Sequence, residues 1–392
     1  MSVLIVLLAM SLAIVVWVYI GYPLTLLALG RMRPAPRMRE PIVLPLSVVI
    51  AAHNEGEVIA AKIENVRSST YPSSSLEVVV ASDGSTDSTV AEARRAGATH
   101  VLDLPRLGKI RTLSAGAAAA TGEILVFTDA DSLFEPESLA ALVSNFADPA
   151  VGGVCGNQVT SRRGADPGVA RGEGLYWRYE HWIKRLEDRV GSTVSAAGGL
   201  YAVRTVLFSP PTLLSGADDF LISSEVVKRG WRLAFDDDAR VLIDSPEESS
   251  LALRRKVRVM NGGLRAAFSL GRLLVPFVGG LYGLEVLSHK VLRRLVPFFL
   301  VLALIANVWL AALEPLWLVL LAPQVLLYVL AVIGWAGRER SWGRRKAAYV
   351  PYFFCLANLA AALAVLSLVR GVRFERWEPS RSESGQGDQQ PA

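Results

Sequence analysis

Cysteine and charge are both scarce in this chain of 392 residues. Its two cysteines, Cys155 and Cys355, lie far apart, so the sequence contains no disulfide framework and the soluble part is expected in a reducing compartment. Only 20% of the residues are charged and 52% are hydrophobic, a composition that excludes a mainly disordered chain. So much apolar surface also argues against a wholly soluble protein.

The surplus of positive charge is small, with 41 Lys and Arg against 36 Asp and Glu. An excess of basic residues can indicate a nucleic-acid partner, but here the basic residues cluster beside apolar segments. That position fits the preference of Lys and Arg for the cytoplasmic side of a membrane. We therefore expect membrane lipids as a partner and no nucleic acid.

The N-terminal segment 3–29 is almost uninterruptedly apolar. About 20 such residues suffice to cross a bilayer. A cleaved signal peptide, the alternative, would carry positive charge before a shorter apolar run, whereas the first basic residue here is Arg31, after the run. We expect an uncleaved transmembrane helix over residues 1–30, with its C-terminal end in the cytoplasm.

The C-terminal third contains three more apolar segments that are long enough to span a bilayer. They are residues 295–313, 316–335 and 349–369, within an expected transmembrane region 291–370. The basic loop 337–346 is expected in the cytoplasm. This arrangement leaves the last helix ending outside although basic residues follow it, a conflict that a tilted or re-entrant helix would remove.

Two further segments are not expected to span. Residues 264–287 are apolar but interrupted by Arg272, Pro276 and two adjacent glycines, which favours helices along the membrane interface over residues 263–290. If this segment did span, two basic loops would move outside, against the charge bias. The polar residues 379–392 have the composition of a disordered tail.

Between these regions, residues 45–262 have the pattern of one soluble domain. Short β-branched runs alternate with helical patterns of about 10–15 residues, and this alternation predicts βαβ units and a parallel sheet. The expected strands are 46–52, 76–82, 100–104 and 123–129, and the expected helices between them are 57–67, 86–96 and 110–120.

Polar residues follow three of these strands at the point where each strand ends. The three clusters are residues 53–55, 83–87 and 129–131. In parallel sheets, ligands bind beyond the carboxyl ends of the strands. We therefore expect the ligand site of the domain at this edge.

Asp129 and Asp131 lie two positions apart just past an expected buried strand. Side chains at positions i and i+2 of an extended chain share a side, so both carboxylates can approach one hard divalent cation. Mg²⁺ commonly binds one or two carboxylates and completes its shell with water and substrate phosphates, which suits a diphosphate ligand. The alternative is two solvated acids in a loop.

Asp83 could accept hydrogen bonds from a base or ribose, with Gly84 allowing a close backbone approach. Alternatively, this segment is a turn in which Ser85 or Thr86 caps the next helix. Lys109 lies at an expected helix start, where it could contact a phosphate or be an ordinary surface lysine.

Asp218 and Asp219 begin an expected amphipathic helix. Carboxylates are stabilised near a helix N-terminus, so capping is one interpretation. The other is that one of them is a general base for an attacking hydroxyl. Arg255 and Arg258 precede the C-terminal apolar region, where they could hold a pyrophosphate leaving group or anionic lipid headgroups.

Six segments, taken in order, resemble family 2 glycosyltransferases, the inverting, membrane-associated type with a GT-A fold. They are SVVIAAHNE, ASDGSTDST, LGKIRTLSAGAAAATGEILVFTDAD, SAAGGLYAVR, ADDFLISSEVVKRGWR and RRKVR. The resemblance covers residues 45–262, and the flanking helices resemble the polysaccharide-synthase-like branch. It implies an α/β GT-A (Rossmann-like) domain joined to transmembrane α-helices, a nucleotide-diphospho-sugar donor and a divalent ion, Mg²⁺ or Mn²⁺.

The resemblance also implies roles for individual residues. The donor-binding residues it suggests are Glu55, Asp83, Lys109, Asp129, Arg255 and Arg258, and the metal ligands are Asp129 and Asp131. Gly198, Gly199 and Leu200 match an acceptor-side loop. The catalytic-base motif, usually Thr-Glu-Asp, appears as residues 217–219, so Asp219 is the implied base and Asp218 keeps the charge of the Glu.

One departure from the family concerns the Gln-x-x-Arg-Trp signature of processive synthases, which falls on residues 255–259. Arg258 remains, but Arg255 replaces the Gln and Val259 replaces the Trp that would stack near an acceptor sugar. We therefore expect transfer of one or a few sugars rather than processive polymerisation.

The sequence thus predicts a metal-dependent inverting glycosyltransferase of a bacterial-type inner membrane, with a cytoplasmic catalytic domain and a glycan or lipid-linked acceptor. One alternative is a processive polysaccharide synthase, for which three or four spans are few. Another is a catalytically silent membrane scaffold, which the acids at 83, 129, 131 and 219 argue against. A nucleotidyltransferase shares the α/β pattern but fits the acidic pair and basic segment poorly.

Overall fold

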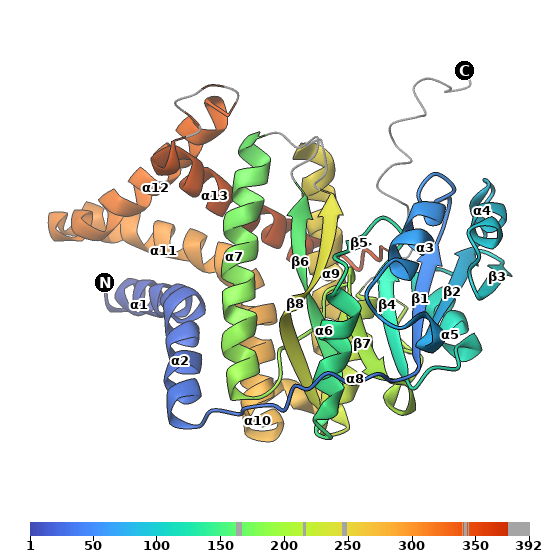
Figure 1. The fold of residues 1–392 in the computed structure, drawn as a ribbon. Helices are drawn as coiled ribbons and strands as arrows, with labels where there is room; N and C mark the ends of the chain where they lie inside the picture. The colour runs from blue at the N-terminus through green and yellow to red at the C-terminus, as the bar shows by residue number, and fades with distance from the viewer. Residues whose placement is uncertain are drawn as a thin grey trace, which may run out of the picture. The chain divides into compact units, whose positions relative to one another are not determined.

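The computed structural model describes residues 1–161, 167–214, 217–244, 249–338, 340, 343 and 345–374 (Figure 1). These residues form two compact units. The helical unit comprises the described residues of Met1–Pro34, Gly164–Leu186 and Glu247–Arg373, and the sheet unit comprises those of Ala35–Arg163, Glu187–Pro246 and Phe374–Ala392. The expected tail 379–392 lies outside the described residues.

The sheet unit is built on an eight-stranded sheet in the order β3-β2-β1-β4-β7-β6-β8-β5. Its strands are β1 (Leu46–Ala52), β2 (Leu76–Asp83), β3 (His100–Leu104), β4 (Ile124–Asp129), β5 (Leu133–Phe134), β6 (Val151–Ser161), β7 (Tyr201–Arg204) and β8 (Arg232–Asp244). Its longer helices are α3 (Ile59–Arg67), α4 (Thr89–Arg95), α5 (Lys109–Ala119), α6 (Ser138–Ser144) and α8 (Asp218–Lys228).

The four strands expected from the sequence form the parallel part of the sheet. β1 pairs with β2 and β4, so that Val48 lies opposite both Val78 and Val126, and β3 continues the ladder from β2. The βαβ expectation is therefore confirmed for β1–β4.

The expectation of a parallel sheet holds only in part for the other strands, where β6 pairs with β8 in parallel. β7 is antiparallel to β4 and β6, and β5 is antiparallel to β8, so the sheet is mixed. β5 has two residues and β7 has four, too few for a recognisable period-2 pattern.

The sheet separates two hydrophobic cores because successive side chains of a strand point to opposite faces. On one face Val48 and Ile50 pack with Ile63 of α3. On the other, Val49 packs with Leu113 of α5. All seven residues of β1 are buried, as expected for a strand covered by helices on both faces.

The helical unit contains the remaining helices. They are α1 (Ser2–Val16), a π-helical segment (Trp17–Gly21), α2 (Tyr22–Met32), most of α7 (Pro167–Val190), α9 (Ser249–Ser269), α10 (Pro276–Glu285), a second π-helical segment (Val286–Leu292), α11 (Arg293–Leu313), α12 (Leu318–Ala336) and α13 (Lys346–Val369). Leu8 of α1 packs against the small residues Ala303 and Ala306 of α11.

Four helical segments of this unit are long and apolar enough to cross a membrane. They are Ser2–Met32, Pro276–Leu313, Pro315–Ala336 and Lys346–Val369. Each includes one of the segments expected to span. The second is longer than expected, because residues 276–290, expected as interface helices, continue into it. Its 38 residues correspond to about 57 Å of helix against a hydrocarbon core of about 30 Å, so only part of it is needed to span.

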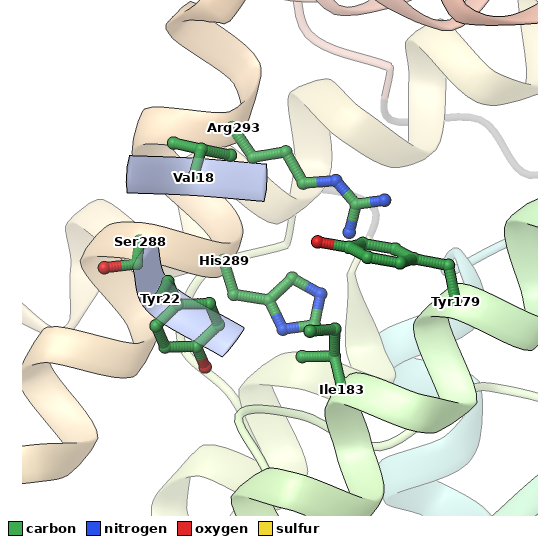
Figure 2. Close-up of a pocket in the computed structure, with 7 residues that line it drawn as sticks. All are labelled: Val18, Tyr22, Tyr179, Ile183, Ser288, His289 and Arg293. Carbon is green, nitrogen blue, oxygen red and sulfur yellow. The ribbon is translucent and has the colours of Figure 1, made fainter. Parts of the chain in front are cut away.

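A buried charge cluster lies within the helical unit. Glu180 of α7 is 5% exposed, and its two carboxylate oxygens lie 2.8 Å from His289 Nε2 and 2.8 Å from Arg293 Nη1. Burial alone would raise the pKa of Glu180, but His289 and Arg293 hold it well below its usual range. Beside them is a cavity of about 10 Å³, room for about one water molecule. The residues that line it, shown in Figure 2, are Val18, Tyr22, Tyr179, Ile183, Ser288, His289 and Arg293.

Candidate active site

The loops that follow β1 and β2 bind each other through short polar side chains. Ser85 Oγ accepts the Asn54 N–H at 3.1 Å, and Asn54 Oδ1 accepts the Thr86 N–H at 2.9 Å. Asp87 Oδ2 accepts the Gly56 N–H at 2.9 Å. The polar clusters at the ends of these two strands therefore meet, as the parallel arrangement predicts.

Asp83 ends β2 and is fully buried. Its Oδ1 accepts the Leu107 N–H at 2.6 Å and the Gly108 N–H at 2.9 Å, and its Oδ2 lies 3.1 Å from Arg106 Nη1. A side chain at Gly84 would meet the backbone nitrogen of Arg106 at 2.9 Å, and Gly84 has a φ of +63°, so both space and conformation favour glycine there. The Asp83 carboxylate thus fixes the loop that leads into α5.

Lys109, the first residue of α5, lies between two acids. Its Nζ is 2.8 Å from Asp129 Oδ1 and 3.3 Å from Asp218 Oδ2, so one ammonium connects the end of β4 with the start of α8. Burial alone would lower the pKa of Lys109, but the two carboxylates outweigh it and raise the pKa above its ordinary value. Lys109 is therefore a cation throughout the physiological range and not a surface lysine.

Asp219 approaches the same point from the first turn of α8. Its Oδ1 accepts the Phe220 N–H at 2.8 Å, which orients the side chain. A methyl group added at Gly198 would lie 3.5 Å from Asp129 Oδ2, 3.9 Å from Lys109 Nζ and 4.0 Å from Asp219 Oδ2. The absence of a side chain at Gly198 thus leaves a small space faced by two carboxylates and one ammonium.

The predicted metal ligands have the donor chemistry for a hard divalent cation. Asp129 ends β4 and is partly exposed, as is Asp131 two residues later. No group of three or more His, Cys, Asp or Glu side chains suited to a metal ion occurs within the described part of the chain. Two carboxylates fit an ion that completes its shell with diphosphate oxygens and water, as Mg²⁺ and Mn²⁺ sites of this kind do. Asp129 and Asp131 would hold it.

The other residues predicted for the site have more enclosed positions. Glu55 is 6% exposed, and its backbone N–H donates to Thr89 Oγ1 at 2.8 Å. The carbonyl of Gly199 accepts a hydrogen bond from Thr128 Oγ1 at 2.7 Å. Leu200 is fully buried in the core of the sheet unit, so its side chain packs there. Any acceptor-side role of this loop therefore rests on Gly198 and the backbone.

Arg255 and Arg258 belong to α9 of the helical unit, as does the neighbouring Lys256. The Lys256 Nζ lies 4.9 Å from the ring centroid of Phe353 on α13. The geometry above therefore includes only residues of the sheet unit, and the leaving-group role of the two arginines stays a prediction.

Two residues near the acids escaped prediction. Arg106 pairs with Asp83 in a loop that no sequence pattern describes. Lys62 is fully buried in α3, on the face formed by Ile59, Ile63 and Val66. A lysine at a core position of an amphipathic helix is unusual, and that pattern could have drawn attention to it.

The mixed sheet and the acids at the ends of β2 and β4 and at the start of α8 define a GT-A-like domain. Residues 47–204 match the family model described as glycosyl transferase family 2. The chain thus contains a family 2 glycosyltransferase domain.

Curated relatives support this assignment. The chain is 25% identical over 228 residues to the poly-β-1,6-N-acetyl-D-glucosamine synthase of Staphylococcus aureus, covering 56% of this chain and 54% of that protein. It is 30% identical over 116 residues to an uncharacterized glycosyltransferase of Nostoc sp., covering 28% and 35%. The chain thus spans about half or less of the length of these relatives.

A solved structure is similar over nearly the whole chain. It is a mannosyltransferase from Pyrobaculum calidifontis in complex with GDP-Man and Mn²⁺, with a TM-score of 0.67 and 25% sequence identity. The match covers 93% of this chain and 99% of that one. The similarity therefore extends beyond the family 2 domain to the helical segments.

Proposed function

We propose that the protein is a membrane-bound inverting glycosyltransferase that moves one or a few sugars from a nucleotide-diphospho-sugar to a glycan or lipid-linked acceptor. The observation that carries this proposal is the gathering of Lys109, Asp129 and Asp219 around the space at Gly198. The ammonium of Lys109 is suited to bind a diphosphate, and the carboxylate of Asp129 is suited to hold the metal ion that binds it too. The carboxylate of Asp219 is suited to deprotonate a hydroxyl.

In the proposed reaction, Asp219 Oδ2 takes the proton of the acceptor hydroxyl while the hydroxyl oxygen attacks the anomeric carbon of the donor sugar. The bond from that carbon to the diphosphate oxygen breaks in the same step, on the opposite side, and the configuration inverts. The diphosphate leaves with the electron pair, and Lys109 stabilises the negative charge that develops on it. A bound Mg²⁺ or Mn²⁺ on Asp129 and Asp131 would share that charge. Arg258, and with it Arg255, is proposed to assist the leaving group.

The comparisons support the donor class and the metal. The mannosyltransferase was solved with GDP-Man and Mn²⁺, which combines a nucleotide-diphospho-sugar with a divalent ion. The acids and Lys109 have the chemistry to bind both. The donor screen described below identifies the sugar and the nucleotide.

Four apolar helices support insertion into a membrane. Large apolar side chains on them are exposed, among them Trp309 at 61% and Leu316 at 76%, and hydrocarbon would cover such surface. The basic residues that follow the first of these helices favour a cytoplasmic sheet unit at a bacterial-type inner membrane.

A processive polysaccharide synthase is the second candidate, favoured by the similarity to the S. aureus synthase over 228 residues. Against it stands Val259, where the processive signature has Trp. Val259→Trp tests this difference: longer products support the role of the altered signature in limiting product length. An unchanged product distribution removes that argument for a non-processive enzyme.

The full chain in detergent, with Mg²⁺ or Mn²⁺, should release a nucleoside diphosphate from one donor in a panel of nucleotide-sugars. Release that disappears with EDTA and in Asp219→Asn supports the proposed function and identifies the donor. If the panel gives no release but a nucleoside diphosphate still binds, adding candidate lipid and glycan acceptors should allow nucleoside diphosphate release. Failure of binding to every donor would contradict the proposal and favour a silent scaffold.

A further inference from the structure

Lys62 is a fully buried lysine beneath the turn that carries Asp129 and Asp131. It projects from α3, and its Nζ lies 3.6 Å from the ring centroid of Phe134. A lysine is rarely buried completely unless it is paired or hydrogen-bonded, since its charge must leave water. Its position therefore needs a compensating interaction.

The compensation comes from the two residues that flank the acids. Lys62 Nζ donates to Thr128 Oγ1 at 2.9 Å, to Ser132 O at 2.6 Å and to Ser132 Oγ at 3.4 Å. One amine thus holds both ends of the turn 128–132, while Asp129 and Asp131 lie between these two anchors. The contacts are made from the protein interior.

The same atoms continue to the loop at Gly198. Thr128 Oγ1 donates to Gly199 O at 2.7 Å, and Ser132 Oγ donates to Asp129 O at 2.8 Å. Lys62 is therefore the first member of a buried network that connects the acidic turn with the neighbour of Gly198. Removing its amine would take away the donor to the Ser132 carbonyl and to the Thr128 hydroxyl, inside the protein where no water replaces it.

We propose that Lys62 is a positioning residue for the metal and the donor diphosphate: it fixes the two carboxylates of the acidic turn from below and couples that turn to the Gly198-Gly199 loop. This inference rests on the proposed function, because it assumes that Asp129 and Asp131 hold a metal ion. It does not make Lys62 a catalytic residue, since the side chain is fully buried and its amine binds Thr128 and Ser132.

Electrostatics alone gives the opposite expectation. Burial lowers the pKa of Lys62 to about 7, although Asp129 and Asp131 act in the opposite direction. In its charged form the amine repels an incoming divalent ion, so removing it while the carboxylates stay in place would tighten metal binding. Loss of positioning would weaken it instead. The sign of the change in Mn²⁺ affinity therefore distinguishes the two effects.

The experiment measures Mn²⁺ binding by electron paramagnetic resonance, with the full chain in detergent and a nucleoside diphosphate present. In Lys62→Met, a substitution of similar length, we expect the Mn²⁺ dissociation constant to rise at least tenfold. Unchanged or tighter binding in this variant would overturn the proposal. If the unsubstituted protein does not bind Mn²⁺ with any nucleoside diphosphate, the proposed function itself fails, which is a distinct result.

Asn65→Ala is the matched control on the same helix. Asn65 exchanges two hydrogen bonds with the backbone of Phe134, at 2.7 Å and 2.9 Å, just beyond the acidic turn. The Asn65→Ala substitution should lower the melting temperature but leave the Mn²⁺ dissociation constant within about twofold of that of the unsubstituted protein. Equal weakening in Asn65→Ala and Lys62→Met would mean general loosening of the fold and would overturn the specific role of Lys62.

Ser132→Ala keeps the proposal testable if Lys62→Met does not fold. It removes the hydroxyl that joins Lys62 to the Asp129 carbonyl but keeps the Ser132 carbonyl. We expect the Mn²⁺ dissociation constant to rise about threefold. No weakening in this variant would count against the network.

Discussion

The ammonium of Lys109 lies 2.8 Å from Asp129 Oδ1, so the first carboxylate of the acidic turn already has a cationic partner within the protein. A divalent ion that binds Asp129 must share this carboxylate with Lys109. A diphosphate that binds there meets both cations at once. In the proposed mechanism, this pair would couple metal binding to donor binding.

Lys109→Met should separate these two effects. Without the ammonium, Asp129 loses its partner, so we expect tighter Mn²⁺ binding in the absence of nucleotide. Nucleoside diphosphate release should nevertheless fall by about 10²-fold, because a cation that stabilises the leaving group is gone. Both can be measured on the same preparation. Lys228→Met, at a surface lysine paired with Glu225, is the control, and near-normal release in Lys109→Met would contradict the assignment.

The acidic turn predicts a metal requirement that depends on two residues. Asp129→Asn and Asp131→Asn each replace one carboxylate by a neutral amide, a weaker ligand for a hard cation. We expect metal-stimulated turnover to be lost in both, measured as nucleoside diphosphate release over a range of Mg²⁺ and Mn²⁺ concentrations. Near-normal rates in both variants would refute the metal assignment.

Asp219 and Asp218 are adjacent but have different surroundings. Asp218 lies 3.3 Å from Lys109, whereas Asp219 Oδ2 faces the space at Gly198. Asp219→Asn should therefore lower sugar transfer by about 10²–10⁴-fold, the range for a lost general base, with donor binding retained. Asp218→Asn should weaken donor binding through Lys109. Isothermal titration with the donor separates these outcomes, and loss of donor binding in Asp219→Asn would show that it is not a dedicated base.

The position of β1–β4 and the meeting of the polar clusters at their ends could be predicted from the sequence. Alternating apolar segments specify such strands, and the rule for parallel sheets places their carboxyl ends together. The closeness of Asp218 to Lys109 could not be predicted from the sequence, because α8 does not follow a strand of the parallel part formed by β1–β4. It depends on how the mixed half of the sheet folds back.

Asp83 shows a second limit. Its sequence context predicts a contact with a base or ribose, which stays a prediction, but it does not indicate that the carboxylate also accepts hydrogen bonds from the backbone of Leu107 and Gly108. Backbone N–H groups are present at every non-proline residue, so the sequence cannot indicate which of them a carboxylate will find. Only the loop conformation decides this.

The pH dependence of stability should include a contribution from Glu77 of β2, which is not one of the acids proposed for the active site. Partial burial raises the pKa of Glu77, but hydrogen bonds from Ser47 and the Thr121 N–H, together with nearby His100, outweigh it and lower the pKa below its ordinary value of 4.5. The Thr121 N–H lies 2.9 Å from Oε2, and His100 Nε2 lies 3.0 Å from Oε1.

A carboxyl group whose pKa is lower in the folded state binds fewer protons there than in the unfolded state. Its stabilisation is therefore present above pH 4.5 and is lost as the pH falls through the lowered value. Glu77→Gln cannot ionise, so we expect it to cost about 1–2 kcal/mol at pH 7 and progressively less in acid. Melting temperatures of both proteins between pH 7 and pH ~3 should converge as the pH falls. A constant difference across this range would mean that the Glu77 hydrogen bonds do not depend on its charge.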